Sequence, residues 1–288
     1  MKTKVYGHGI DRIGVRQITP TLYWICHCIG EGATEINGGF AADFARVNPV
    51  LDPEASDINY NAYLFLDDKT FLIDTLAPKQ CETMLEVLSD LLQGRPLDYM
   101  WLSHTELPHA GNTAAIRRAY PDLQLLTVGG HDHYEVHGLE DARLLHFGDR
   151  IDTGRHTLEI IEPLFVDHAL TQWIYEHDSG FLCPVDWALN LHRADQCFRF
   201  MDEMEEVGYS AERFMHEVST TSRFVFPWLR WADPDQTVRD IDRFIATYDI
   251  RIFAPSHTNV IRKDMPRYMK ALREAMRMAI TSEYDLVF

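Results

Sequence analysis

The run from Tyr99 to Asn112, YMWLSHTELPHAGN, gives the strongest indication of the fold. Its apolar start predicts the end of a short buried strand, and the polar residues that follow predict a loop. That loop carries His104, Glu106 and His109 within one run of six residues. Imidazole and carboxylate groups that converge at a strand end are typical ligands of divalent metals. We therefore predict a metal site at this strand end.

Strand and helix patterns alternate on both sides of this run. The expected strands are 21–29, 60–65, 70–73, 97–102, 123–128, 157–161, 171–175, 180–183 and 251–254. The expected helices are 79–93, 112–119, 194–207, 211–218, 234–248 and 266–281. Hairpins interspersed with helices predict an α/β protein in which sheets pack on each other and helices cover them.

Length and composition agree with this class. A chain of 288 residues has room for two small domains or one large α/β domain, and without repeats or a low-complexity linker we expect a single domain over 1–288. The segment Glu31 to Asp57, rich in Gly, Ala and acidic residues, is the one long irregular stretch, and we expect it to cover a site.

The charge balance excludes two classes of partner. The net charge of −17 repels phosphate backbones and anionic lipids, so we expect neither nucleic acid nor membrane partners. The N-terminus has no apolar signal region, and the five scattered cysteines predict reduced thiols. Together these features predict a cytoplasmic protein, and a homodimer is the default for an enzyme of this size.

Three further metal-ligand residues follow apolar strands elsewhere in the chain. His168 comes after Leu164-Phe165-Val166-Asp167, Asp186 ends the apolar run from Gly180 to Val185, and His257 follows the strand predicted at 251–254. Any one of them alone is more often a surface residue or a hydrogen-bonded core residue. Their repetition at four strand ends, counting the His104 loop, favours one shared metal site.

This order of residues resembles the metallo-β-lactamase superfamily and, within it, the diiron domain of flavodiiron proteins. The resemblance spans roughly 18–275, including the hairpin from Asn59 to Thr75 and the motif Ala254-Pro255-Ser256-His257. It implies an αββα sandwich that binds two non-haem irons. The implied metal ligands are His104, Glu106, His109, His168, Asp186 and His257, with Asp186 as the bridging carboxylate.

Two departures from the family pattern affect the expected chemistry. Pro108 stands where the family has an aspartate ligand, which leaves one iron with only His109, His257 and the bridging Asp186. This iron would then have more coordination positions open to water, oxygen or substrate, or it would be absent. The chain also stops at Phe288, so we expect no FMN domain and an electron supply from another protein or from the substrate.

The resemblance implies a diiron oxidoreductase that reacts with O2 or NO. It acts either as an oxygenase of a small organic substrate, for which the aromatic segment 224–231 would line the pocket, or as an O2 or NO reductase with an external electron donor. The alternatives are a zinc-dependent hydrolase of an ester, thioester or lactam, and a non-catalytic diiron O2 sensor.

Other polar residues have more ordinary interpretations. We expect Asp74 to support the ligand loops through hydrogen bonds and not to bind metal itself. We interpret His131, His133 and His137 as members of a polar loop, and segment 224–231 equally well as core or dimer contact.

Overall fold

The computed structural model describes residues 3–29, 52, 54–55, 57–128, 139, 141–168 and 170–282. The chain divides into two compact units. Unit 1 comprises Met1–Cys28, Asn59–Pro163 and His168–Asp178, and unit 2 comprises Ile29–Ile58, Leu164–Asp167 and Ser179–Phe288. The single domain over 1–288 therefore stays a prediction. The proposed covering segment lies largely outside the described residues, as do His131, His133 and His137.

Apart from the end residues Ile29 and Ile58, unit 1 contains an eight-stranded sheet in which the described strands follow one another in chain order. Its strands are β1 (Lys4–Tyr6), β2 (Ile13–Thr19), β3 (Leu22–Ile29), β4 (Ile58–Leu66), β5 (Thr70–Ile73), β6 (Tyr99–Trp101), β7 (Gln124–Val128) and β8 (Arg143–Leu145). The β4–β5 hairpin is antiparallel, whereas β5 to β8 pair in parallel. The carboxyl ends of β5, β6 and β7 consequently share one edge of the sheet.

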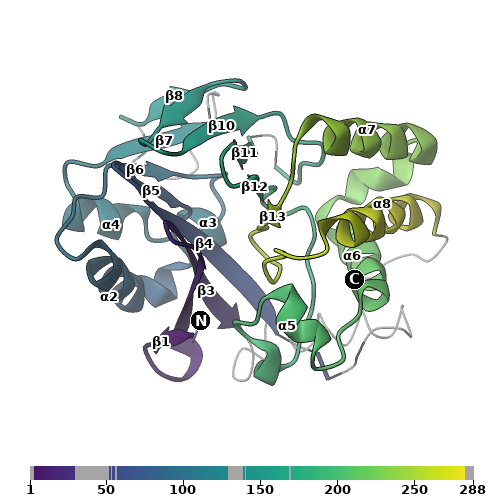
Figure 1. Ribbon diagram of the computed structural model, residues 1–288, viewed down its shortest axis with the longest axis horizontal. Helices are drawn as coiled ribbons and strands as arrows, with labels where there is room; N and C mark the ends of the chain where they lie inside the picture. Colours follow the sequence, from purple (N-terminus) through teal and green to yellow (C-terminus); the bar gives the residue numbers. More distant parts are fainter. Residues whose placement is uncertain are drawn as a thin grey trace. The chain divides into compact units, whose positions relative to one another are not determined.

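Helices cover one face of this sheet. After the 3-10 helix η1 (Gly9–Asp11) near the N-terminus, the chain forms η2 (Pro78–Gln80), α2 (Cys81–Leu92), α3 (Leu107–Ala110) and α4 (Thr113–Ala119). Figure 1 shows α2 and α4 beside the strands of unit 1. Met84 and Leu88 of α2 and Ile116 of α4 form one buried core with Leu64 and Leu72 of the sheet. The period-2 alternation of β4 and β5 thus presents one apolar face to these helices.

A second set of paired strands in unit 1 flanks His156, which lies between β9 and β10. Strands β9 (Arg150–Asp152), β10 (Thr157–Ile161) and β11 (Trp173–Glu176) pair in antiparallel fashion. Leu158 and Ile160 of β10 are buried, whereas Glu159 between them is only partly buried. This alternation is typical of a strand with one face in the core.

Unit 2 combines a short parallel strand pair with several helices. Its strands β12 (Phe181–Cys183) and β13 (Ile252–Phe253) pair in parallel. Its helices are η4 (Ala194–Gln196), α5 (Met201–Glu205), α6 (Ala211–Val225), η5 (Pro227–Trp231), α7 (Pro234–Thr247) and α8 (Met265–Thr281). Both α6 and α7 pack against α8, in the green to yellow part of Figure 1. Ser210 and Asp233 cap α6 and α7 through side-chain acceptors.

The structure corrects several predicted boundaries. The helix expected over 194–207 is instead η4 followed by the short α5, because Phe198 has a left-handed backbone with φ of 62° that interrupts a helix. The helix expected to end at 218 continues to Val225. The three-residue strands β1, β8 and β9 were not predicted, since they have few residues in which alternation can be recognised. The seven-residue β2 was also not predicted, and its first four residues are all buried, so it shows no alternating pattern there.

The cysteines differ from one another in their bonding. Cys26, Cys81 and Cys183 are free thiols, whereas Cys28 and Cys197 are each disulfide-bonded, so the expectation of reduced thiols is wrong for these two.

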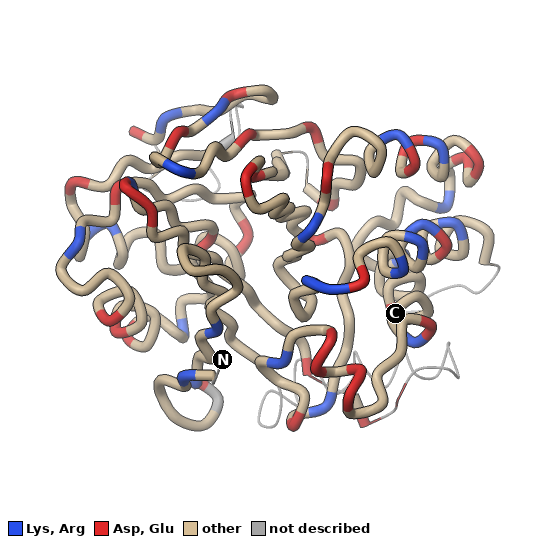
Figure 2. Tube along the Cα trace, viewed as in Figure 1, with Lys and Arg blue, Asp and Glu red and all other residues tan. Residues whose placement is uncertain are grey.

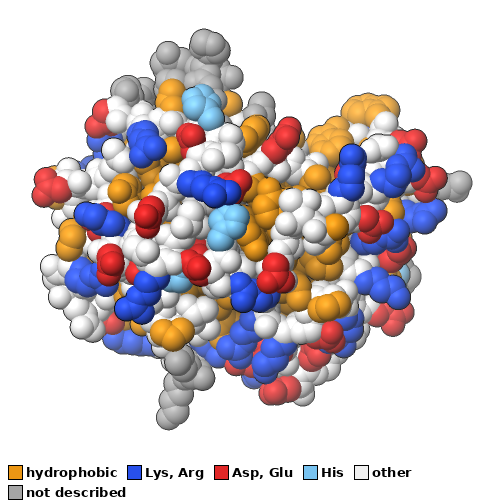
Figure 3. Space-filling model, turned by 45° about the horizontal axis from the view of Figure 1, so that its top comes forward, with side chains coloured by type: hydrophobic (Ala, Val, Ile, Leu, Met, Phe, Trp, Pro, Cys, Tyr) orange, Lys and Arg blue, Asp and Glu red, His pale blue; other side chains and the backbone are white. Residues whose placement is uncertain are grey.

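The surface carries charges of both signs. Figure 2 shows Lys and Arg alternating with Asp and Glu along the chain, and Figure 3 shows both signs interspersed on the visible face. No helix within the described residues is long and apolar enough to cross a membrane.

Candidate metal centre

The loop that carries His104 and His109 leaves β6 at the shared edge of the unit 1 sheet. Leu102 and Ser103 follow the end of β6 at Trp101, and the chain then turns into α3. Pro108 occupies the first turn of α3, where a missing N–H and a fixed φ are tolerated. The helical turn brings His109 back towards the strand end, since the rings of His104 and His109 lie 4.0 Å apart between centroids.

The structure brings three of the predicted ligands together within unit 1. One possible ligand atom from each of His104, Glu106 and His109 lies within 4.8 Å of the others. Both imidazoles are buried, whereas the carboxylate of Glu106 is exposed and lies 3.9 Å from Nε2 of His104. Two imidazoles and one carboxylate form a mixed nitrogen and oxygen donor set, which suits non-haem iron.

Asp74 holds this loop as the sequence predicted. It follows β5 with a left-handed φ of 57° and is fully buried. Its carboxylate accepts the backbone N–H of Ser103 at 2.8 Å and the Ser103 hydroxyl at 2.9 Å, and it lies 2.8 Å from Nδ1 of His109. A carboxylate on Nδ1 fixes the ring so that Nε2 is the nitrogen available to a metal. The expected supporting role is thereby confirmed.

Two further residues support the loop and were missed by sequence reasoning. The Thr75 hydroxyl and backbone N–H both donate to the carbonyl of His109, at 2.9 and 2.7 Å. The side-chain amide of Asn112 donates to the carbonyls of Thr75, Leu76 and Ala77. These bonds tie α3 to the end of β5. They use main-chain partners far along the chain, so no sequence spacing reveals them.

His168 lies in the same unit and is half-buried. Its ring stacks on that of His104, with 6.0 Å between centroids and 26° between planes. Its Nδ1 accepts the backbone N–H of Leu170 at 3.2 Å. His104 and His168 are 64 positions apart in the sequence (168 − 104 = 64), so it is the fold that brings these two predicted ligands together.

The other two predicted ligands lie together in unit 2. Asp186 and His257 follow β12 and β13, and since these strands are parallel their carboxyl ends share an edge. Oδ1 of Asp186 lies 3.0 Å from Nε2 of His257, and both residues are buried, with 6% and 9% of their surface exposed. A buried carboxylate–imidazole pair at adjacent strand ends agrees with the strand-end reasoning.

Hydrogen bonds hold the two loops of unit 2 against each other. Val185 has a left-handed φ of 51°, and its carbonyl accepts the Ser256 N–H at 2.7 Å. Thr258 donates its hydroxyl to the carbonyl of Ala188, and Asn259 donates its N–H to the Asn190 side chain at 3.1 Å. Asp186 and His257 thus lie on loops with little freedom to separate.

Helix α6 supports the loop that follows Asp186. The carboxylate of Glu217 is fully buried and accepts the Leu191 N–H at 3.2 Å and the Tyr209 hydroxyl at 2.6 Å. Arg213 donates to the same carboxylate at 2.8 Å. Burial raises the pKa of Glu217 to about 7, against the opposing effects of Arg213 and Tyr209. This network places the titratable carboxylate of Glu217 against the loop that follows Asp186.

The residues of the aromatic segment 224–231 differ in how far they are buried. Phe226 and Leu229 are buried, and Phe226 packs with Phe165 and Trp228, whereas 78% of Trp231 is exposed. The Trp228 indole donates to the carbonyl of Val166 at 2.7 Å. The core interpretation is therefore right for part of the segment.

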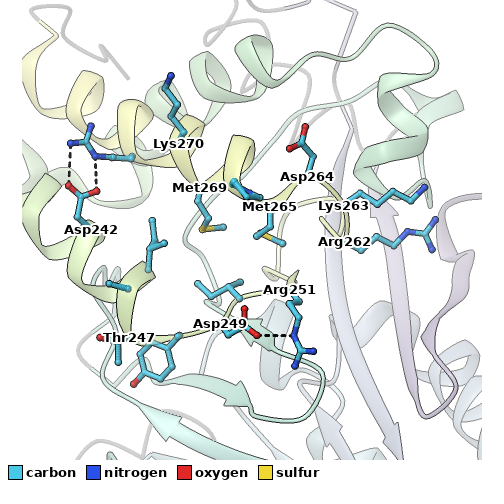
Figure 4. A pocket seen from close by; sticks show the side chains of 16 residues that line it. Asp242, Thr247, Asp249, Arg251, Arg262, Lys263, Asp264, Met265, Met269 and Lys270 are labelled. Carbon is cyan, nitrogen blue, oxygen red and sulfur yellow. Dashed lines mark hydrogen bonds and ion pairs between the residues drawn. The ribbon is translucent and has the colours of Figure 1, made fainter.

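Unit 2 also contains a cavity of about 920 Å³ between the end of α7 and the start of α8. Figure 4 shows Met265 and Met269 near its middle, with the paired Arg251 and Asp249 at one edge and Asp242 at another. Asp242 accepts a hydrogen bond from Arg273 at 2.8 Å. Neither Asp186, His257 nor segment 224–231 lines it. This cavity is therefore separate from the candidate metal residues of the unit.

Comparison with solved structures defines the class of fold. A flavodiiron protein from Giardia intestinalis matches with a TM-score of 0.69 and 18% identity over 92% of this chain and 59% of its own. Rubredoxin oxygen:oxidoreductase from Desulfovibrio gigas matches with a TM-score of 0.69 and 18% identity, over 92% and 61% of the two chains. The chain thus has the metallo-β-lactamase-like α/β fold of these proteins.

Comparison with the sequences of known proteins identifies named relatives of the chain. A nitric oxide reductase from Moorella thermoacetica is 28% identical over 216 residues, which is 74% of this chain and 52% of that protein. No family model matches the chain. The matching solved structures include proteins named as flavodiiron proteins, which confirms the resemblance seen in the sequence. The chain spans about half the length of that relative.

Proposed function

We propose that this chain forms the non-haem diiron part of an oxidoreductase that reduces O2 or NO with electrons from an external donor. The observation that carries the proposal is the cluster of His104, Glu106 and His109, in which one possible ligand atom of the carboxylate lies within 4.8 Å of those of two buried imidazoles. The names of the relatives, a nitric oxide reductase and a rubredoxin oxygen:oxidoreductase, support this activity over oxygenation of an organic substrate.

The proposed iron ligands are the six residues predicted from the sequence. His104, Glu106, His109 and His168 belong to unit 1, and Asp186 and His257 belong to unit 2. The donor set fits iron, because imidazoles combine with carboxylates that stabilise its higher oxidation states. When bound by these residues, a pair of ferrous irons would supply two electrons for the reduction of O2 or NO, and the external donor would supply any further electrons that the reduction needs.

The protein's own residues orient this chemistry. Asp74 fixes the tautomer of His109 and accepts both the N–H and hydroxyl of Ser103. The exposed Glu106 carboxylate lies on the solvent side of the cluster, and we propose that substrate and water approach from there. Pro108 supplies no side-chain ligand and no base, which argues against a hydrolase that needs an aspartate at this position.

The electron donor, assembly and location are further parts of the proposal. We propose that electrons arrive from a flavin- or iron-containing protein partner, that the chain assembles as a homodimer, and that it works in the cytoplasm without nucleic acid or membrane partners. The net charge of −17 supports the exclusion of the last two.

The proposal is tested by anaerobic reduction of iron-loaded protein followed by addition of O2 or NO. We expect close to two irons per chain and rapid consumption of one of the gases under continued reduction. Replacement of Glu106 by Ala should remove the iron and the consumption together. Protein that contains zinc alone and consumes neither gas would contradict the proposal and indicate a hydrolase.

A further inference from the structure

A second cluster of metal-ligand side chains lies in unit 1 and shares no residue with the His104 loop. His156 directly precedes β10, Glu176 is the last residue of β11, and Asp178 lies in the turn that follows. The antiparallel pairing of β10 and β11 places Leu158 opposite Glu176. One possible ligand atom from each of the three residues lies within 4.8 Å of the others.

The imidazole of His156 is held in an orientation suited to metal binding. Its Nε2 lies 2.7 Å from the Thr21 hydroxyl, and 7% of the residue is exposed. Its Nδ1 is buried, accepts no hydrogen bond from the described residues, and lies 3.2 Å from Oε1 of Glu176. With Nε2–H donated to Thr21, Nδ1 presents its lone pair to the carboxylates, which is the usual arrangement of a metal-ligating histidine.

The surrounding carboxylates make this position favourable for a cation. Glu176 is fully buried, and its Oε1 accepts the backbone N–H of Asp178 at 2.7 Å. Asp67 accepts the backbone N–H of His156 at 2.9 Å. The Glu176 carboxylate beside it raises the pKa of His156, and Asp67 and Asp178 add to this effect. The negative charge of these carboxylates stabilises a proton on the imidazole, and it would likewise stabilise a divalent metal ion bound at the position of that proton.

We infer that His156, Glu176 and Asp178 form a second cation site that binds a divalent transition metal, with water completing the coordination. Ligand atoms of a tetrahedral zinc ion with bonds of about 2.1 Å lie about 3.4 Å apart. The ligand atoms of this cluster, which lie within 4.8 Å of one another, therefore need to approach only slightly. Asp178 is exposed, so its side chain can rotate and bring its carboxylate closer to the other two ligands. One imidazole and two carboxylates suit zinc or manganese. The inference does not rest on the proposed function.

The experiment is a calorimetric titration of the full, iron-loaded chain with Zn²⁺ alone, above the ordinary pKa of imidazole. We expect the wild type to bind one zinc per chain in addition to its iron. Asp178→Asn and Glu176→Gln should each weaken this binding by at least about tenfold. Glu159→Gln is the matched control, because Glu159 lies on the same hairpin but pairs with Arg150 and His177. It should bind zinc as the wild type does.

Two results would overturn the inference. One is a wild type that binds no additional zinc, and the other is an Asp178→Asn variant that binds it as tightly as the wild type. If the buried Glu176→Gln change prevents folding, Asp178→Asn decides alone. Where His156 is protonated, below its pKa, zinc must also displace the imidazole proton, so the binding heat there should differ between buffers of different ionisation enthalpy. Equal heats there would contradict His156 as a ligand.

Discussion

At the scale of single residues, the candidate centre depends on how two imidazole rings are held. Ser103 links them, because its hydroxyl lies 3.3 Å from Nδ1 of His104 and 3.2 Å from Nδ1 of His109. Asp74 accepts from both Ser103 groups and faces His109. One buried carboxylate therefore positions the strand end, the hydroxyl and a ligand ring together.

Asp74→Asn tests this positioning role. The amide replaces one acceptor oxygen by a donor, so it can no longer accept from Ser103 and orient His109 at once. We expect iron affinity to fall by about 10- to 100-fold with the fold retained, as measured by competition with a chelator. Asp122→Asn, at an exposed position of the same unit, is the control. Equal iron affinity in the Asp74→Asn protein and the wild type would contradict the role.

Pro108→Asp tests the departure from the flavodiiron pattern. Pro108 lies in the first turn of α3, where an acidic residue is also well tolerated by the helix dipole. The change adds a carboxylate next to His109, and we expect iron to dissociate more slowly from the variant. Pro108→Ala is the matched control without a ligand atom. Dissociation from Pro108→Asp as fast as from Pro108→Ala would show that this position does not reach the metal.

Sequence reasoning succeeds at this scale where the signal is local. His104, Glu106 and His109 lie in one short loop, so their grouping within unit 1 was predictable from spacing alone. Thr75 and Asn112 were not predictable, because they act by hydrogen bonds to main-chain carbonyls that only the fold brings near.

At the scale of elements, the strand-end principle accounts for the placement of the predicted ligands. Parallel pairing of β5, β6 and β7 gathers Asp74 and the His104 loop, and parallel pairing of β12 and β13 gathers Asp186 and His257. The hairpin β4–β5 and helix α2 were predictable from clear periodicity. Helix α5 was not, because a left-handed Phe198 separates it from η4.

Helix α6 gives a prediction about pH. Burial raises the pKa of Glu217 to about 7, above its ordinary value of 4.5, so the folded state holds a proton that the unfolded state has lost. The free energy of unfolding should therefore fall as the pH rises from 4.5 to about 7, by at most about 3 kcal/mol. Denaturant unfolding at several pH values measures this slope.

Glu217→Gln should remove that slope, because the amide does not titrate. Glu212→Gln is the control, since Glu212 lies on the same helix near its exposed start. A Glu217→Gln protein whose stability changes with pH as steeply as the wild type would assign the slope to other groups.

At the scale of the whole molecule, iron binding should stabilise the chain. A ligand that binds only the folded state adds RT ln(1 + [L]/Kd) to the free energy of unfolding, or about 2.7 kcal/mol at a hundredfold excess over Kd. We expect the melting temperature to rise on anaerobic addition of ferrous iron and to return on chelation. Glu106→Ala should abolish most of the rise, and a full rise in that variant would place the iron elsewhere.

The α/β class and the flavodiiron resemblance were accessible from sequence because the ligand spacing and the flanking strands agree along most of the chain. The division into two compact units was not, because it follows from contacts between segments far apart in the chain. The covering role predicted for segment 31–57 still stands as a prediction, since most of that segment lies outside the described residues.

The proposed function depends above all on a coupled pair of irons held by the predicted residues, and Mössbauer spectroscopy of protein loaded with ⁵⁷Fe detects such a pair directly. We predict close to two irons per chain in a spin-coupled, diamagnetic diferric state, which is lost in Glu106→Ala. A single uncoupled high-spin ferric iron per chain, or a signal unchanged by Glu106→Ala, would contradict the proposed diiron centre.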